Sequence, residues 1–278
     1  MSNNVTIHHV IFASKKVKIA VLSGYGLNCE EETFAAFLEA GRYFGVNVKG
    51  EIIHINEVIR NAGLLKQYNI MAIPGGFSYG DDTGAGNAFA LNMINNLQEE
   101  IQEFLAGDKL VIGICNGCQI LMKLINKFTN VTLTCNDMHQ YQCRWVNVKV
   151  CNKSIWFNEI DELYIPIAHG EGKFYTTDNV LHDLIYNQNI ALRYIKEDKG
   201  YANNIFPYNP NGSVYDIAAV SDDSGRTLLI MPHPERAIFF TQQYNWTYVK
   251  EMELRSGRAI PIYGDGFKIF CNAIKYFM

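Results

Sequence analysis

The chain has 278 residues, of which 48% are hydrophobic and 19% are charged, and its formal net charge is −4. This is a globular composition with enough apolar material for a sizeable core. The small negative charge and the lack of basic runs argue against a broad surface for nucleic acid or an anionic membrane.

The first 24 residues do not resemble a signal peptide, because the charged leader is missing and the short apolar run is broken by Lys15, Lys16 and Lys18. No uninterrupted apolar stretch is long enough to span a membrane. The seven cysteines, an odd number in a long chain, favour free thiols in a reducing compartment over a disulfide framework. We therefore expect a soluble cytoplasmic protein in which residues 1–16 form an N-terminal extension.

The first half of the chain alternates apolar strands with amphipathic helices. A buried strand is predicted at 17–24, and the helix after it would have Asn28 as its N-cap, three glutamates in its first turn and an end at Gly41 or Gly45. The elements expected next are two strands, a helix and a fourth buried strand: 49–55, 70–76, 87–105 and 109–114. Strands that alternate with helices imply right-handed crossovers and a mostly parallel sheet.

The pattern changes after about Asn126, where alternating segments are joined by short links with Gly, Asn and Pro turns. The segments predicted there are four strands and a closing amphipathic helix: 141–151, 163–169, 190–196, 226–235 and 267–277. The first three of these strands suggest antiparallel additions to the parallel core. No internal repeat or clear linker is visible, so we expect one mixed α/β domain over 17–278, with helices flanking a mostly parallel central sheet.

Residues 113–117, Gly-Ile-Cys-Asn-Gly, have the form G-x-C-x-G between an apolar strand and a helix. This is the cysteine version of the nucleophile elbow. The glycines allow a sharp turn, and Cys115 would lie at a helix N-terminus, whose dipole favours the thiolate. Cys118 would lie about one helical turn further on and pack as a small apolar residue.

Three other interpretations of Cys115 and Cys118 stay open at this point. A C-x-x-C redox pair also begins a helix, although the usual one follows the first strand of a shorter fold. A zinc site would need a second pair, and Cys135 and Cys143 are too far apart to form another C-x-x-C. Two buried structural cysteines are about as compatible with the elbow pattern as a nucleophile is.

A nucleophilic cysteine needs a base, and the base needs a group that orients it. The last predicted strand carries His233 and Glu235, whose spacing places both on one face. Glu235 could bind one ring nitrogen of His233 while the other faces Cys115, and Pro232 and Pro234 would hold the segment extended. A solvated His and Glu at a strand end is the simpler alternative.

Gly75 and Gly76 close the third predicted strand. Their backbone N–H groups, with that of Asn116, are candidate donors to an oxyanion, although an ordinary Gly turn has the same sequence. The elbow, the His-x-Glu pair and the Gly-Gly turn each fall at the C-terminal end of a predicted strand. Ligands of open α/β sheets bind at those ends.

Other motifs are weaker. There is no G-x-x-x-x-G-K-[ST], and residues 24–29 give G-x-G-x-x-C, a dinucleotide fingerprint without its third glycine. The segment 169–172, His-Gly-Glu-Gly, lacks further ligands at metal spacing, so no metal site is predicted. Arg144 and Trp145 could serve docking or simply belong to an exposed strand.

Six segments resemble the glutamine amidotransferase subunits of phosphoribosylformylglycinamidine synthase, which belong to the class I glutamine amidotransferases. They are "PGGFSYGD", "GICNGCQIL", "CRWVN", "AHGEG", "NPNGS" and "MPHPER". The resemblance runs from about Val17 to the C-terminal helix and implies a flavodoxin-like core. The chain departs from this pattern in three places. Many such subunits have a basic residue within 82–86 and a Phe at the position of Cys118, and neither is present here. The chain also has a long insertion at 237–266.

The resemblance implies that Cys115 is the nucleophile, His233 the base and Glu235 its orienting residue. It further implies substrate roles for four residues, the oxyanion donors Gly75, Gly76 and Asn116 and the glutamine-holding Gln119.

The implied reaction is hydrolysis of L-glutamine to glutamate and ammonia. A synthetase subunit, PurL, would use the ammonia with ATP and Mg²⁺ to convert formylglycinamide ribonucleotide to its amidine in de novo purine biosynthesis. A small bridging subunit, PurS, is a further implied partner, and no cofactor is expected in this chain. Two alternatives stay open, another elbow-type cysteine hydrolase of the same fold and a non-catalytic glutamine-binding regulatory subunit.

Overall fold

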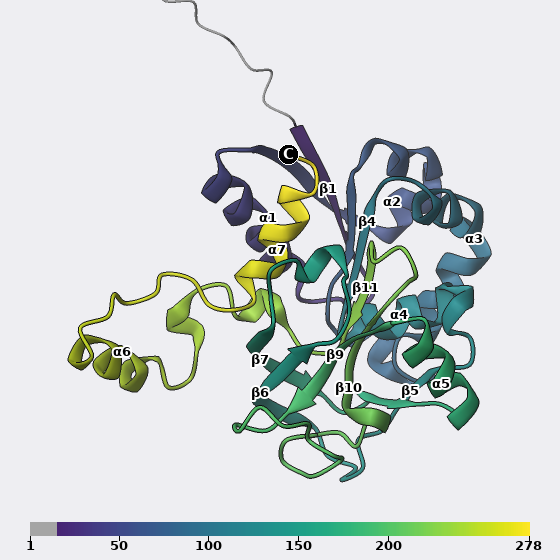
Figure 1. Cartoon of the computed structure of the whole chain (residues 1–278). Coiled ribbons are helices and arrows are strands. Elements are labelled where there is room, and N and C mark those ends of the chain that lie inside the picture. The colour runs from purple at the N-terminus through teal and green to yellow at the C-terminus, as the bar shows by residue number, and fades with distance from the viewer. Residues whose placement is uncertain (1–15) are drawn as a thin grey trace, which may run out of the picture.

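The computed structural model describes residues 16–278, which build a nine-stranded sheet with helices on both faces (Figure 1). The sheet order is β2-β1-β3-β4-β11-β10-β9-β6-β7. Its parallel strands are β2 (Asn47–His54), β1 (Lys16–Ser23), β3 (Ile70–Ile73), β4 (Leu110–Ile114) and β11 (Thr227–Ile230). Most of the nine strands are thus parallel, as the alternating first half predicts.

The other four strands of this sheet pair antiparallel. They are β10 (Ile217–Ser221), β9 (Ile190–Ile195), β6 (Gln142–Val150) and β7 (Glu162–His169). A separate antiparallel pair is formed by β5 (Thr132–Thr134) and β8 (Lys173–Tyr175). The prediction of antiparallel additions after Asn126 is therefore confirmed.

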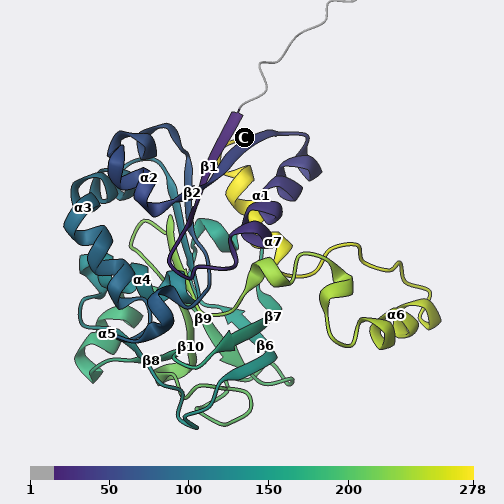
Figure 2. The ribbon, with the colours of Figure 1, turned by 180° about the vertical axis from the view of Figure 1, so that it is seen from behind.

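The described residues form seven α-helices. They are α1 (Glu30–Phe44), α2 (Ile55–Arg60), α3 (Asn87–Ala106), α4 (Asn116–Leu124), α5 (Asp178–Tyr186), α6 (Trp246–Arg255) and α7 (Phe267–Lys275). Helices α1 and α7 pack together on one side of the sheet, and α3 and α4 pack together on the other (Figures 1 and 2). Strands β1, β3, β4 and β11 are largely buried between these layers, as their apolar runs require, whereas the edge strand β2 is mostly exposed.

Two local predictions need correction. Asn28 is not the N-cap of α1, because the helix begins at Glu30 and Cys29 occupies that position without a side-chain cap bond. Of the two proposed helix ends, Gly45 is the right one: its φ of 65° is left-handed, and its amide donates to the carbonyl oxygens of α1. Residues 1–15, most of the predicted N-terminal extension, lie outside the described residues, and β1 begins at Lys16.

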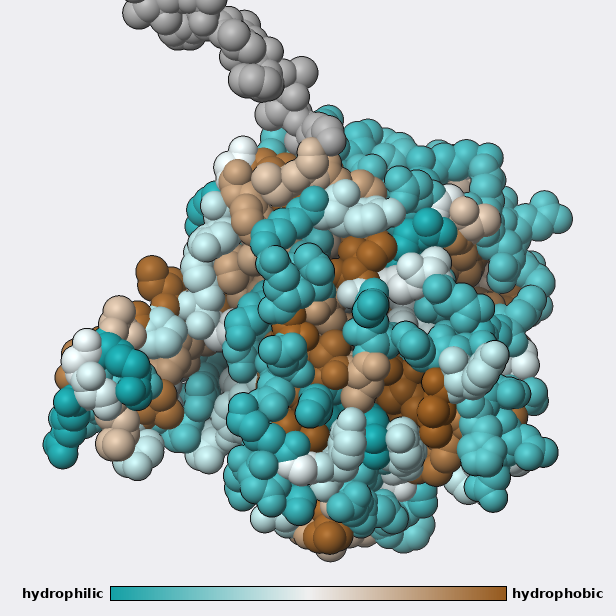
Figure 3. Space-filling view, viewed as in Figure 1, coloured by the Kyte–Doolittle hydropathy of each residue, from teal (hydrophilic) through white to brown (hydrophobic). Residues whose placement is uncertain are grey.

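The segment 237–266 forms an arm that projects from the body and carries α6 (Figure 1). Its base is fixed by a bridge between Phe239 and Tyr263, and the Tyr263 hydroxyl donates to Glu39 of α1 at 2.9 Å. No residue of α6 is buried, and Leu254 and Ile262 are 51% and 72% exposed. Brown hydrophobic patches are visible over the arm in Figure 3.

Among the described residues, no helix combines the length and the apolar character that a membrane crossing needs.

Candidate functional site

Cys115 stands at the turn between β4 and α4 in a strained conformation, with φ 52° and ψ −106°. Positive φ is uncommon for a residue with a Cβ and is found at functional turns. The turn is held because the Cys115 amide donates to the Ile230 carbonyl of β11 at 2.8 Å.

The two glycines of the elbow are required sterically. A Cβ on Gly117 would lie 1.9 Å from the carbonyl oxygen of Ile73, and one on Gly113 would lie 2.5 Å from that of Gly117. Backbone atoms occupy both places, so no side-chain rotation could relieve the clash. The G-x-C-x-G pattern therefore records close packing of α4 against the ends of β3 and β4.

His233 and Glu235 do not lie on a strand, contrary to the prediction for 226–235. Strand β11 ends at Ile230, and Pro234–Arg236 form a single 3-10 turn. Proline cannot donate to a sheet ladder, and its fixed φ suits the first position of a helical turn. The His233 amide instead donates to the Pro166 carbonyl of β7 at 2.7 Å, which fixes the segment.

The turn still brings the two side chains together. Nδ1 of His233 lies 2.5 Å from Oε1 of Glu235, and both side chains are almost entirely buried. Nε2 of His233 has no hydrogen-bond partner among the described residues. The expected His–Glu contact is thus present, although a turn and not a strand produces it.

The imidazole and the elbow cysteine approach each other beside Gly75. A Cβ built on Gly75 would lie 2.8 Å from Cε1 of His233 and 3.5 Å from Cβ of Cys115. Only a residue without a side chain leaves this space open. The Cys115 sulfur also lies 3.6 Å from the Ala168 carbonyl oxygen at the end of β7.

The charges around His233 favour its protonated form. Burial opposes protonation, but the Glu235 carboxylate and the Cys115 sulfur outweigh it, so the pKa of His233 is raised well above its usual range. An imidazolium between a carboxylate and a sulfur is an arrangement able to exchange protons with a reacting group.

Cys118 lies in α4, is completely buried, and has its pKa raised well above the usual value, first by burial and then by Cys115. A buried thiol with a raised pKa is unreactive. This matches the expectation that Cys118 packs as a small apolar residue. All seven cysteines are free, so Cys115 and Cys118 form no disulfide.

Gly75 and Gly76 do not form the predicted turn but lie in an extended segment that pairs with the loop before α1. The Gly75 carbonyl accepts from the amides of Asn28 and Cys29, and Phe77 donates to the Gly26 carbonyl. Gly76 and Leu27 are thus a non-hydrogen-bonded antiparallel pair, so the N–H of Gly76 points away from Leu27. A Cβ on Gly76 would lie 2.4 Å from the Gly26 carbonyl oxygen, so only glycine fits at position 76.

Asn116 and Gln119 are buried and bonded to each other, with Asn116 Nδ2 donating to Gln119 Oε1 at 2.8 Å. Asn116 Oδ1 accepts from the Ser78 amide of the loop after Gly76, and Gln119 Nε2 donates to the Glu171 carbonyl at 2.6 Å. Both amide side chains therefore brace the elbow against neighbouring loops. The sequence suggested only the Asn116 backbone and a substrate contact for Gln119.

His169, in the His-Gly-Glu-Gly segment, is buried beside the site. Its Nδ1 lies 3.2 Å from Asn136 Oδ1, and burial, with His233 as the second cause, lowers the pKa of His169 to about 3. A Cβ on Gly172 would lie 2.2 Å from the His169 ring, so the loop folds tightly over it. His169 is therefore a neutral structural side chain.

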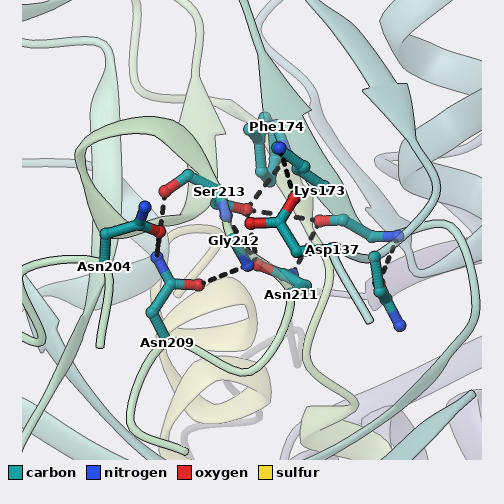
Figure 4. A network of polar contacts seen from close by, with 10 residues as sticks. Asp137, Lys173, Phe174, Asn204, Asn209, Asn211, Gly212 and Ser213 are labelled. Carbon is teal, nitrogen blue, oxygen red and sulfur yellow. Dashed lines mark hydrogen bonds and ion pairs between the residues drawn. The ribbon is translucent and has the colours of Figure 1, made fainter. Parts of the chain in front are cut away.

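The segment 209–213, Asn-Pro-Asn-Gly-Ser, is hydrogen-bonded to the end of that loop and to β8 (Figure 4). Asn211 Nδ2 donates to the Gly172 carbonyl at 2.8 Å, and Ser213 Oγ accepts from the Phe174 amide at 3.0 Å. Asp137 pairs with Lys173 across Gly212, where a Cβ would overlap the carboxylate. These contacts give the 209–213 segment a structural role that its sequence alone did not indicate.

Arg144 and Trp145 lie in β6, apart from the elbow. The Arg144 guanidinium stacks on Phe206 at 4.7 Å, and Trp145 packs on Tyr164 at 5.1 Å. Both line a pocket of about 540 Å³ to which the arm contributes Tyr244, and none of the predicted site residues lines it.

The described residues contain one group of side chains spaced closely enough to hold a metal ion: Cys29, His233 and Glu235, whose donor atoms lie within 4.8 Å of one another. Arg236 Nη2 already lies 2.9 Å from the Cys29 sulfur, and its positive charge disfavours a cation there. Cys29 and Arg236 were not among the predicted site residues. Two sequence features could have pointed to these residues: the incomplete glycine motif ends at Cys29, and Arg236 directly follows Glu235.

Comparisons with known proteins agree with this geometry. A sequence model of the CobB/CobQ-like glutamine amidotransferase domain matches residues 16–277. A phosphoribosylformylglycinamidine synthase subunit PurQ from Methanococcus maripaludis is 41% identical over 271 residues, which cover 94% of this chain and 97% of that protein. The PurQ subunit of Dehalococcoides mccartyi is 38% identical over 269 residues, covering 94% and 98% of the two chains.

Among solved structures, a chain in the structure of PurLQS from Thermotoga maritima has the same fold, with a TM-score of 0.67 and 27% identity. The alignment covers 95% of this chain and all of that one. The chain therefore belongs to the glutamine amidotransferases and, within them, to the PurQ subunits of phosphoribosylformylglycinamidine synthase.

Proposed function

We propose that this chain hydrolyses glutamine to glutamate and ammonia with Cys115 as nucleophile, His233 as acid and base, and Glu235 as the residue that orients His233. The observation that carries the proposal is the meeting of the elbow cysteine and the imidazole over Gly75, with Glu235 bound to the far ring nitrogen. Kinship with PurQ subunits supports glutamine as the substrate.

In the first half of the reaction, the Cys115 sulfur attacks the side-chain amide carbon of glutamine. Negative charge develops on the amide oxygen, and backbone N–H groups of Gly75, Gly76 and Asn116 are the proposed donors to it. Each such donor contributes about 3 kcal/mol to lowering the barrier. The His233 imidazolium gives its proton to the departing nitrogen, so ammonia leaves and a glutamyl thioester remains.

In the second half, neutral His233 takes a proton from water, and the resulting hydroxide attacks the thioester carbon. The carbon–sulfur bond breaks, which releases glutamate and returns the sulfur to its starting state. Glu235 holds Nδ1 of His233 through both halves, so Nε2 stays directed at the reacting atoms. The buried pair suits this role because water cannot compete for the hydrogen bond.

We further propose that the ammonia passes to a PurL-type synthetase subunit, with a PurS-type subunit in the same complex. The solved relative was determined as PurLQS, which supports such an assembly. ATP and Mg²⁺ would act on the synthetase subunit in forming formylglycinamidine ribonucleotide. A cytoplasmic location is the corresponding proposal, and seven free cysteines favour a reducing compartment.

The test compares glutamine-dependent with ammonia-dependent synthesis in the assembled complex. Cys115→Ala should lower the glutamine-dependent rate by at least about 10³-fold, while the ammonia-dependent rate stays at the wild-type level. Cys271→Ala, which removes a buried thiol of α7, is the matched control and should keep both rates.

Loss of activity in Cys118→Ala with retention in Cys115→Ala would reject the elbow assignment. Glutamine binding without hydrolysis in the wild-type complex would favour a regulatory subunit. Hydrolysis of other amides or esters in preference to glutamine would favour a different elbow hydrolase.

A further inference from the structure

Cys29 is a second completely buried thiol beside the imidazole of His233. Its sulfur lies 3.2 Å from the point that a Gly75 Cβ would occupy, and Cε1 of His233 lies 2.8 Å from the same point. The absence of a side chain at position 75 therefore lets Cys29, His233 and Cys115 approach one another. Cys29 reaches this place because it directly precedes α1, at the C-terminal end of the loop after β1.

Arg236 ties Cys29 to the His–Glu segment. Its Nη2 donates to the Cys29 sulfur at 2.9 Å, while its Nε lies 3.8 Å from Oε1 of Glu235, the atom that binds His233. The same Nε lies 3.9 Å from Glu32 in the first turn of α1. One guanidinium thus connects the start of α1 with the turn that carries His233.

We propose that Cys29 is a positioning residue for the glutaminase reaction, held by Arg236 so that its sulfur fixes the imidazole of His233 between Glu235 and Cys115. The inference rests on the proposed function, because it assigns a role toward the proposed base. Small displacements of a reacting group cost large factors in rate, so a buried contact on the ring serves catalysis directly.

Two other roles for Cys29 fit the geometry less well. If Cys29 bound a metal ion, its sulfur would have to be shared between the ion and the Arg236 guanidinium. A second nucleophile would need a strained turn like that of Cys115, whereas Cys29 has φ −110° and ψ 21° and its side chain has no exposed surface. The remaining role for Cys29 is to pack against the His–Glu segment and to accept a hydrogen bond from it.

The experiment measures glutamine hydrolysis in the assembled synthase. Cys29→Ala should lower kcat by about 10- to 100-fold with little change in KM, because the ring loses its support while the substrate contacts stay. Cys29→Ser keeps an acceptor for Arg236 and should recover part of that loss. Arg236→Met should lower kcat as Cys29→Ala does, and Arg236→Lys should lose less.

The double variant Cys29→Ala/Arg236→Met separates a shared role from two independent ones. If Arg236 acts through Cys29, the double variant should be about as slow as the slower single variant. The matched controls are Cys271→Ala, another buried thiol, and Arg42→Met, a surface arginine of α1 whose side chain is 79% exposed. Both should keep the wild-type kcat, as should the ammonia-dependent rate in every variant.

A pH profile adds a readout that a merely structural role would not move. The contact with Cys29 is one of the causes that raise the pKa of His233. In Cys29→Ala the alkaline limb of kcat, which reports loss of the imidazolium proton, should therefore move to lower pH. The titratable or charged groups that face His233 are Glu235, Cys115, Cys29, His169, Tyr141 and Arg236, and only one of them changes in this variant.

Wild-type kcat and an unmoved alkaline limb in Cys29→Ala, or strictly multiplicative losses in the double variant, would overturn the inference. Full activity in Cys115→Ala would instead overturn the proposed function. If Cys29→Ala proves too unstable to assay, Arg236→Met and Arg236→Lys decide the question, because the Arg236 side chain is 40% exposed and leaves no buried cavity.

Discussion

Nδ1 of His233 lies 2.5 Å from Oε1 of Glu235, and neither side chain is reached by solvent to any appreciable extent. The pair stabilises the protonated ring, so Glu235→Gln should lower glutaminase kcat by about 10²- to 10⁴-fold without loss of glutamine binding. The measurement is steady-state hydrolysis beside glutamine binding by calorimetry. An unchanged kcat would exclude Glu235 as the orienting residue.

The same pair makes stability depend on pH. The folded-state pKa of His233 lies above the usual 6.5. Protonation of His233 therefore contributes fully to the free energy of unfolding below pH 6.5, and this contribution is lost as the pH rises through the raised pKa. The free energy of unfolding of the wild type should therefore fall toward that of Glu235→Gln as the pH increases above neutral. Denaturant unfolding of both proteins over this range measures it, and a constant difference would contradict the assignment.

His169 should produce the opposite dependence. Burial lowers its pKa from 6.5 to about 3, so its contribution to stability is complete above pH 6.5 and declines as the pH falls below that value. The expected slope is up to about 1.4 kcal/mol per pH unit. His169→Gln removes the titrating group while keeping a donor toward Asn136, and its unfolding free energy should fall less steeply between pH 6.5 and 4.5. Equal slopes for the two proteins would show that His169 is not buried as a neutral ring.

Gly117→Ala should disrupt the elbow. Its Cβ would lie 1.9 Å from a backbone oxygen of Ile73, so either α4 or β3 must move, at a cost of about 3 kcal/mol in unfolding free energy. Gly63→Ala is the matched control, because its nearest neighbour would be a side-chain atom at 3.6 Å. We expect the control to change stability by less than about 1 kcal/mol. Similar destabilisation by both would mean that the clash at position 117 is easily relieved.

Gln119→Ala should loosen the His-Gly-Glu-Gly loop. The side chain joins Asn116 to the Glu171 carbonyl. Its loss removes the donor to that carbonyl and leaves Asn116 Nδ2 with only the longer contact to Asp81 Oδ1 at 3.4 Å. Amide hydrogen exchange over residues 169–172 should become faster, and kcat/KM for glutamine should fall by about 10-fold. Gln98→Ala, at an exposed position of α3, is the control. Unchanged exchange together with a higher KM would favour a direct substrate contact for Gln119.

The length of the last strand shows where local patterns are insufficient. Residues 226–235 contain a continuous apolar run, but the Met231 amide is the last to bond to the neighbouring strand β10, by donating to the Ala218 carbonyl. Beyond it, Pro232 and Pro234 supply no donors, and His233 bonds to β7 instead. The prediction of Asn28 as a cap was wrong for a similar reason: the loop before α1 pairs with the segment of Gly75 and Gly76, and the helix starts at Glu30.

By itself, the sequence determined the main strands and helices of the parallel half, the change to antiparallel pairing after it, and the elbow around Cys115, because apolar periodicity and glycine spacing are local properties of the chain. It did not indicate the strands β5, β8 and β10 or the helices α2, α5 and α6. Only the tertiary structure decided which side chains meet. The sheet order β1-β3-β4-β11 sets the C-terminal ends of four parallel strands side by side, and the residues that follow them are Cys29, Gly75, Cys115 and His233. Arg236 and Cys29, which are 207 residues apart, come into contact through that order, and no local pattern encodes it.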